Sequence, residues 1–175
     1  MKKHVHVSTN SGNNEWYTPP QYTEAARSVM GGIDVDPASC EVANRLVRAT
    51  QFFSVKENGL DQVWNGRVWM NPPYSQPQIG QFCRKLVDQV GGTVTEACVL
   101  VNNATDTRWF HTLLEKAAAV CLIKGRVKFV SDTGELGSPL QGQAILYFGD
   151  NSDIFARRFS KFGTVLYARA GNSQW

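Results

Sequence analysis

The chain has 175 residues, a formal net charge of +3, and 42% hydrophobic, 11% aromatic and 19% charged residues. This is the composition of a globular domain, and it excludes a disordered chain, a coiled coil and a collagen-like fibre. The length predicts a single domain over residues 1–175, with a flexible segment at 1–14. Because no apolar run approaches a membrane span and no apolar segment follows the first lysines, we expect no membrane attachment and a cytoplasmic protein.

The cysteines carry no metal-site signal. Cys40, Cys83, Cys98 and Cys121 are far apart in the sequence, with no Cys-x-x-Cys pair and no cysteine–histidine cluster. This spacing predicts no metal site, and without a secretion signal the thiols are expected to be free. The slight excess of basic residues is compatible with a polyanionic partner but does not identify one.

Helix-like and strand-like segments alternate along the chain. The first helix is expected to start at Thr18-Pro19-Pro20-Gln21, with Thr18 as N-cap and Pro19 at the first helical position, and to stop at Gly31-Gly32. The same capping pattern recurs at Ser75-Gln76-Pro77-Gln78. The expected elements are, in order, helix 19–30, strand 33–36, helix 41–48, an extended stretch 50–55, strand 67–70, helix 75–90, strand 97–102, helix 109–118, and strands 119–123, 144–148 and 164–169.

This alternation predicts an α/β fold with a mostly parallel central sheet and helices on both faces. In such sheets, ligands bind outside the carboxyl ends of the strands. Two polar segments directly follow apolar strands, Asp36-Pro37-Ala38-Ser39 and Asn71-Pro72-Pro73-Tyr74. We therefore expect both segments to face the functional site.

The segment Asn71-Pro72-Pro73-Tyr74 suggests a specific chemistry. Its two prolines fix the backbone and remove two donors, so the Asn71 side-chain oxygen and the Pro72 carbonyl are both free to accept. Two acceptors suit an exocyclic NH2 group, and the Tyr74 ring offers a stacking surface for a flat heterocycle. Accepting both hydrogens would favour the charge that develops on the attacking nitrogen, without a strong base. The alternative interpretation is a simple surface turn, since Asn-Pro is a frequent turn former.

The sequence resembles the S-adenosylmethionine-dependent amino-methyltransferases, and more closely the phage and prophage DNA adenine-N6 methyltransferases (Dam-like enzymes). The resemblance implies a Rossmann-like methyltransferase domain that binds S-adenosylmethionine and methylates N6 of an adenine flipped out of double-stranded DNA. It covers most of the chain, to about Phe148. The blocks that carry it are EWYTPP (15–20), IDVDPAS (33–39), NGLDQVWNGRVWMNPPYS (58–75), VLVNNATDTRWF (99–110) and IKGRVKF (123–129).

The resemblance also implies cofactor-binding residues. It matches the segment around Thr18 with the element that closes over the methionine end of the cofactor, where a helix start offers N–H groups to a carboxylate. It matches Asp61 with the acidic residue that takes the adenine amine. We expect loss of Asp36 to weaken cofactor binding and loss of Asp34 to lower stability. The full cofactor set is Trp16, Thr18, Pro19, Asp34, Asp36, Pro37, Ala38, Ser39 and Asp61.

One departure from the wider family leaves an assignment open. No Phe-x-Gly-x-Gly motif follows the strand over 33–36. The segment therefore matches either the first cofactor motif or the acidic end of the second strand. Whether Asp36 meets the ribose or the methionine end is not decided by the sequence.

On the substrate side, Arg108, Lys124, Arg126 and Lys128 lie near expected strand exits and are candidates for phosphate contacts. The polar, glycine-rich segment 130–143 is the candidate for a target-contacting hairpin. The length leaves no room for a separate target-recognition domain, so specificity is expected from loops or a second subunit. Whether the protein is a monomer or a homodimer stays open, and a phage-encoded enzyme would act in the host cytoplasm.

Two alternatives remain at this stage. The same tetrapeptide serves the methylation of other planar nitrogens, such as cytosine N4, an RNA base or a protein glutamine. A protein that kept the fold but lost the cofactor would instead be a non-catalytic, nucleic-acid-binding decoy. The missing glycine motif is the one observation that favours the decoy.

Overall fold

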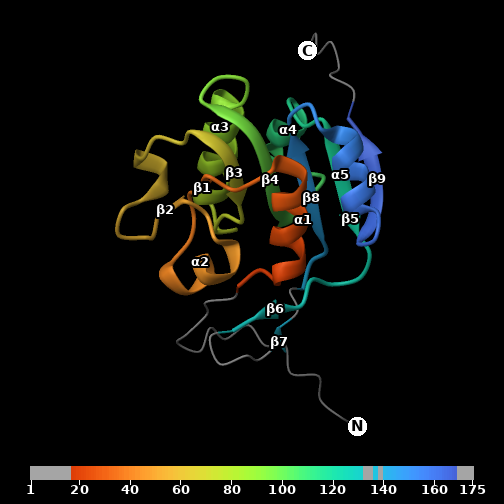
Figure 1. Cartoon of the computed structure of the whole chain (residues 1–175), viewed down its shortest axis with the longest axis horizontal. Helices are drawn as coiled ribbons and strands as arrows, with labels where there is room; N and C mark the ends of the chain where they lie inside the picture. The colour runs from red at the N-terminus through yellow and green to blue at the C-terminus, as the bar shows by residue number, and fades with distance from the viewer. Residues whose placement is uncertain (1–16, 132–135, 138–139, 169–175) are drawn as a thin grey trace.

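The computed structural model describes residues 17–131, 136–137 and 140–168 (Figure 1). The segment 1–14 that was expected to be flexible, and the cofactor candidate Trp16, lie outside the described residues. The helices are α1 (Pro20–Met30), α2 (Glu41–Val47), α3 (Gln78–Gln89), α4 (Arg108–Leu114) and α5 (Ser152–Phe159), with a 3-10 turn η1 (Gly59–Asp61). The strands are β1 (Val35–Asp36), β2 (Gln51–Phe52), β3 (Gly66–Met70), β4 (Val94–Asn102), β5 (Ala119–Ile123), β6 (Phe129–Val130), β7 (Leu136–Gly137), β8 (Gln143–Phe148) and β9 (Gly163–Tyr167).

The described residues form a seven-stranded sheet in the order β2-β1-β3-β4-β8-β5-β9, and β6 and β7 form a separate antiparallel hairpin. The neighbours from β2 to β4 pair in parallel. β8 pairs antiparallel with both β4 and β5, and β9 pairs antiparallel with β5. Five strands of this sheet, β2, β1, β3, β4 and β5, therefore point the same way, and β8 and β9 run in the opposite direction. From β4 to β9, each neighbouring pair is antiparallel. The fold is thus α/β with a mixed sheet.

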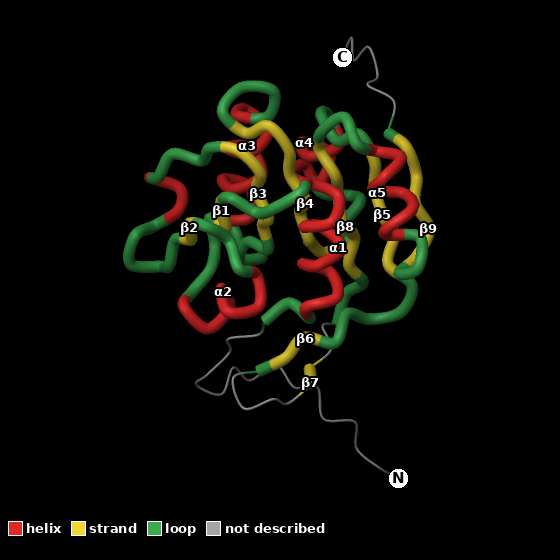
Figure 2. Tube along the Cα trace, in the orientation of Figure 1, coloured by secondary structure: helices red, strands yellow, loops and turns green. Residues whose placement is uncertain are grey.

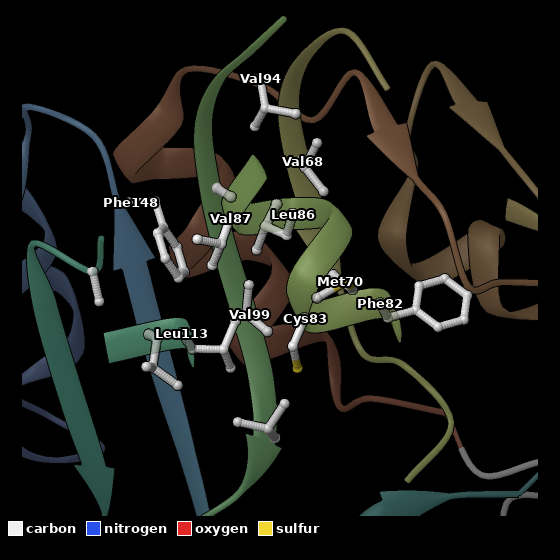
Figure 3. Packing of buried hydrophobic residues seen from close by; sticks show 14 of the residues in the cluster. Val68, Met70, Phe82, Cys83, Leu86, Val87, Val94, Val99, Leu113 and Phe148 are labelled. Carbon is white, nitrogen blue, oxygen red and sulfur yellow. The ribbon is translucent and has the colours of Figure 1, made fainter. Parts of the chain in front are cut away.

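Helices cover both faces of the sheet, as the alternation predicted (Figures 1 and 3). Along β3, Val68 and Met70 belong to the cluster packed under α3 and α4, whereas Trp69 belongs to the cluster under α1 and α5. This division follows from the pleat, because successive side chains of a strand point to opposite faces. From Val68 to Met70, both faces of β3 are buried, which explains the apolar sequence of this part of the strand.

Two helix starts differ from the expectation. α1 begins at Pro20 with Pro19 as N-cap, and no side chain caps it. The cause is the proline pair, because a residue that precedes proline is pushed out of the helical region, and Pro19 indeed has φ −55° and ψ 137°. The Thr18 N-cap and the start at Pro19 were therefore wrong. α3 likewise begins later, at Gln78, with Pro77 as an N-cap that makes no side-chain hydrogen bond.

Other features complete the fold. α5 was not predicted; it packs two aromatic side chains, Phe155 and Phe159, onto the sheet. Cys40, Cys83, Cys98 and Cys121 all lie in the described residues, and no disulfide bond joins them. In the ranges that the structure describes, no helix has the length and apolar character needed to cross a membrane.

An ion pair joins the chain before β1 to the start of β3. The Arg67 guanidinium donates from Nε to Asp34 Oδ2 (2.7 Å) and from Nη2 to Asp34 Oδ1 (2.6 Å), and the Arg67 backbone N–H donates to Oδ2 (2.8 Å). These hydrogen bonds lower the pKa of the Asp34 carboxyl below its usual range. Gly66, at φ +81°, has no room for a side chain, since a Cβ would lie 2.4 Å from Asp34 Oδ2. Asp34 is therefore part of the framework that aligns β1 with β3.

We expect Asp34→Asn to lower the free energy of unfolding by about 1–2 kcal/mol at pH 7, since the pair is partly exposed and solvent weakens it. Because folding lowers the pKa of Asp34, its stabilisation is present above its unfolded pKa and is lost as the pH falls below about 4. Urea denaturation between pH 3 and 7 measures this difference. Glu41→Gln, in an exposed pair with Arg45, is the control and should change stability little; an equal loss in both variants would contradict the assignment.

Candidate active site

A cavity of about 890 Å³ lies at the carboxyl ends of β1 and β3. Its walls come from segments that are distant in sequence: the residues before α1, the turn after β1, the stretch after β2, the segment after β3 and the β6–β7 hairpin. Both polar segments expected at strand exits contribute to it. The predicted residues that line it are Thr18, Asp36, Pro37, Ala38, Ser39, Asn71, Pro72, Pro73 and Tyr74.

Asp36 is a buried acid at the end of β1. Its side chain and backbone are 3% exposed, and burial raises the pKa of its carboxyl to about 7. The Ser39 hydroxyl and the Ala38 backbone N–H, which donates to Asp36 Oδ1 over 3.3 Å, reduce this rise only in part. None of the ion pairs among the described residues involves Asp36. The cavity wall therefore carries an acceptor that a ligand with hydrogen-bond donors would satisfy.

The turn that holds Asp36 is fixed to its neighbours. The Phe53 backbone N–H donates to the Asp36 carbonyl (3.0 Å), and the Ser39 backbone N–H donates to the Phe53 carbonyl (2.9 Å). Gly59 lies against this turn so closely that a Cβ would meet the Pro37 carbonyl oxygen at 1.8 Å. The indole of the fully buried Trp64 donates to the Gly59 carbonyl (2.8 Å). The NGLDQVW block therefore supports the cavity wall.

Asn71 makes hydrogen bonds at both ends of its side-chain amide. Its Nδ2 donates to Thr18 Oγ1 (3.2 Å), and its Oδ1 accepts from the Tyr74 hydroxyl (2.8 Å). Burial raises the pKa of Tyr74 well above its usual range, so its hydroxyl stays protonated and available as a donor. The Tyr74 ring packs against the core cluster under α3. The tyrosine thus has a hydroxyl contact with Asn71 that the sequence did not suggest.

Three cofactor candidates of the described chain do not line the cavity. Pro19 is the N-cap of α1, and Asp34 is paired with Arg67. Asp61 is exposed, and its Oδ2 accepts from Asn58 Nδ2 (2.7 Å), whereas Asn58 itself does line the cavity. Asp61 therefore reaches the cavity only through Asn58.

The sequence did not point to many of the other lining residues, among them Cys40, Phe53, Asn58 and Gly59. Of these, Asn58 and Gly59 lie in the NGLDQVW block, which marked the region without assigning either residue a role. Phe53 follows a strand of only two residues, so no apolar run drew attention to it. Near the cavity and elsewhere in the described ranges, no three His, Cys, Asp or Glu side chains are arranged to hold a metal ion.

The basic candidates are exposed at the surface. Lys124, Arg126 and Lys128 alternate with the buried Val127 and Phe129 on the way into β6. Arg108 is exposed at the first position of α4.

The predicted hairpin is present in the described part of 130–143. Phe129 and Gly137, on its two strands, both line the cavity, and Figure 2 shows the hairpin beyond the end of the sheet at which α1 begins.

The chain belongs to the family of DNA N-6-adenine-methyltransferases (Dam), whose family model matches residues 6–149. It is 29% identical over 167 residues to the DNA N-6-adenine-methyltransferase of Escherichia phage T1, a match that covers 86% of this chain and 65% of the relative. It is 28% identical over 128 residues to the DNA N-6-adenine-methyltransferase of Haemophilus phage HP1 (strain HP1c1), covering 71% of this chain and 72% of that relative. The match to the T1 relative thus spans less than two thirds of its length. The family resemblance of the motifs is confirmed.

Asp36→Asn should stabilise the ligand-free protein at alkaline pH. Because folding raises the pKa of Asp36 to about 7, the stability linked to the neutral carboxyl is present below its unfolded pKa, near 4, and is lost as the pH rises through 7. The neutral amide avoids this loss, which at pH 8 is on the order of 3 kcal/mol. Urea denaturation at pH 4 and pH 8 should show a gain only at pH 8. A variant less stable than the wild type at both values would contradict the burial of a carboxyl that has no cationic partner.

Proposed function

We propose that this protein is a DNA methyltransferase that uses S-adenosylmethionine to methylate N6 of an adenine in double-stranded DNA, on a Rossmann-like methyltransferase domain. One observation carries the proposal: the cavity unites the Asp36–Ser39 turn and the Asn71–Tyr74 segment, which leave adjacent parallel strands. The family membership supplies the reaction class, and the phage relatives suggest action in a host cytoplasm.

The chemistry of the cavity fits S-adenosylmethionine. The volume of about 890 Å³ lies within the range of small-molecule and cofactor sites. When bound, the cofactor would supply a methyl group on a cationic sulfur. The buried Asp36 carboxylate would accept from its ammonium or ribose hydroxyl groups, and the adjacent Ala38 and Ser39 would complete the turn that holds it. The backbone of the segment around Thr18, before α1, would form another wall.

The Asn71–Tyr74 segment would hold the acceptor amine. The N6 lone pair of adenine is delocalised into the ring, so the amine is a weak nucleophile. Asn71 Oδ1 and the Pro72 carbonyl oxygen would accept its two hydrogens and stabilise the positive charge that develops on the nitrogen. Tyr74 remains neutral and would contact the face of the base. The amine would take the methyl group with its lone pair, which leaves the cofactor as the neutral thioether, and the proton lost by the methylated nitrogen would pass to solvent, so no side chain acting as a strong base is required.

The DNA would approach on the side of the hairpin. Base flipping requires that the duplex backbone be held while the nucleotide enters the cavity. Lys124, Arg126 and Lys128 are exposed on the segment that leads into the cavity wall at Phe129, and would contact phosphates. Arg108 is the further candidate. The β6–β7 hairpin would contact the target sequence.

Asn71→Ala tests the reaction directly. With labelled S-adenosylmethionine and unmethylated duplex DNA, the wild type should yield N6-methyladenine on digestion. Loss of one acceptor should lower turnover about a hundredfold, with cofactor affinity almost unchanged. Asn65→Ala, exposed and outside the cavity, is the matched control and should retain turnover.

The outcomes separate the alternatives. Label on cytosine N4 would assign a different acceptor nitrogen. Absence of cofactor binding in calorimetry would indicate a decoy. Full turnover by Asn71→Ala would refute the role of the amide.

Cofactor binding should release protons near neutral pH. At pH 7 the Asp36 carboxyl is about half protonated, since its pKa is about 7, and donors from the cofactor favour the charged form. Calorimetry in buffers of different ionisation enthalpy should reveal the release, and affinity should weaken as the pH falls below 7. Asp36→Asn should abolish the buffer dependence and weaken binding by at least about 1 kcal/mol. Proton release that persists in Asp36→Asn would assign it to another group.

A further inference from the structure

Thr18 lies in a segment that is held at both ends. On one side, the Tyr17 backbone N–H donates to the Val130 carbonyl (2.8 Å), and the Val130 N–H donates to the Tyr17 carbonyl (3.0 Å). On the other side, Pro19 and Pro20 restrict the backbone at the start of α1. Thr18 is only 6% exposed and lines the cavity. Its hydroxyl therefore has a fixed position.

The Thr18 hydroxyl does not cap α1. It accepts a hydrogen bond from Asn71, which lies 53 positions later in the chain. Thr18 Oγ1 accepts from Asn71 Nδ2 over 3.2 Å, while the Tyr74 hydroxyl donates to Asn71 Oδ1 over 2.8 Å. The amide group of Asn71 thus lies with its nitrogen toward Thr18 and its oxygen toward Tyr74. The second lone pair of Oδ1 remains for another donor.

The orientation of this amide matters for the chemistry. The two ends of an asparagine amide have similar shapes, and rotation by 180° exchanges an acceptor for a donor. In the wrong orientation, Asn71 would present its own N–H groups to the N–H groups of the acceptor amine. In the observed orientation, Thr18 Oγ1 is the acceptor for the nitrogen end, and the oxygen end stays available to a donor.

We propose that Thr18 is a positioning residue, which keeps the Asn71 amide in the orientation that accepts from the target amine. This inference rests on the role proposed above for Asn71. It also gives Thr18 a function different from closure over the cofactor: a cofactor contact would act on the affinity for S-adenosylmethionine, whereas amide orientation would act on turnover.

Thr18→Val removes the oxygen acceptor while keeping the shape of the side chain. Loss of one hydrogen bond should lower kcat about three- to tenfold, with the KM and Kd for S-adenosylmethionine unchanged. Thr18→Ser restores a hydroxyl oxygen and should recover most of the turnover. Thr23→Val is the matched control: Thr23 is fully buried one turn into α1 and donates to the Pro20 carbonyl (3.0 Å), away from Asn71. Its loss should affect the melting temperature and not kcat.

A double-mutant cycle distinguishes failure of this inference from failure of the proposed function. If Thr18 acts through Asn71, Thr18→Val should cause no further loss of turnover in the Asn71→Ala background, measured under single-turnover conditions with labelled cofactor. The same fold-loss in both backgrounds, or a loss confined to cofactor affinity, would overturn the inference. If Asn71→Ala itself keeps wild-type turnover, the proposed role of Asn71 fails first.

Discussion

The parallel pairing of β1 and β3 is the constraint on which the site depends. Val35 aligns with Val68, so both strands end at the same edge of the sheet. Asp36 is the last residue of β1, and Asn71 directly follows β3. The Asp34–Arg67 ion pair fixes this alignment just before β1. A slip in this register would separate the buried carboxyl from the asparagine amide, although each would remain in its own turn.

Around this pair, the cavity is built by contacts between segments that no local pattern connects. Gly59 packs closely against the turn after β1, and the Trp64 indole donates a hydrogen bond to the Gly59 carbonyl. The Tyr17–Val130 backbone pairing places the hairpin beside the residues before α1. Each contact uses a backbone group or a buried indole, so each is short and specific. The walls are consequently set by the packing of the domain, and the proposed reaction would use only a few polar groups on them.

In the proposed reaction, those polar groups would act by accepting hydrogen bonds. Asp36 is buried without a cationic partner, and Asn71 is oriented by neutral neighbours. Such a site suits a reaction between a cationic cofactor and a neutral amine, because both bring donors or positive charge and the protein needs only to accept.

The sequence by itself determined the α/β class, most strands and helices, the two polar strand exits and the family, because apolar periodicity and short motifs are local properties. It did not reveal α5, in which only Phe155 and Phe159 are fully buried. Nor did it reveal the antiparallel half of the sheet, since strand direction depends on distant partners. It also misplaced Thr18 as a helix cap. Only the tertiary structure paired Asp34 with Arg67, left Asp36 in the cavity and joined Thr18 to Asn71, because a side chain's partner is chosen by packing across the fold.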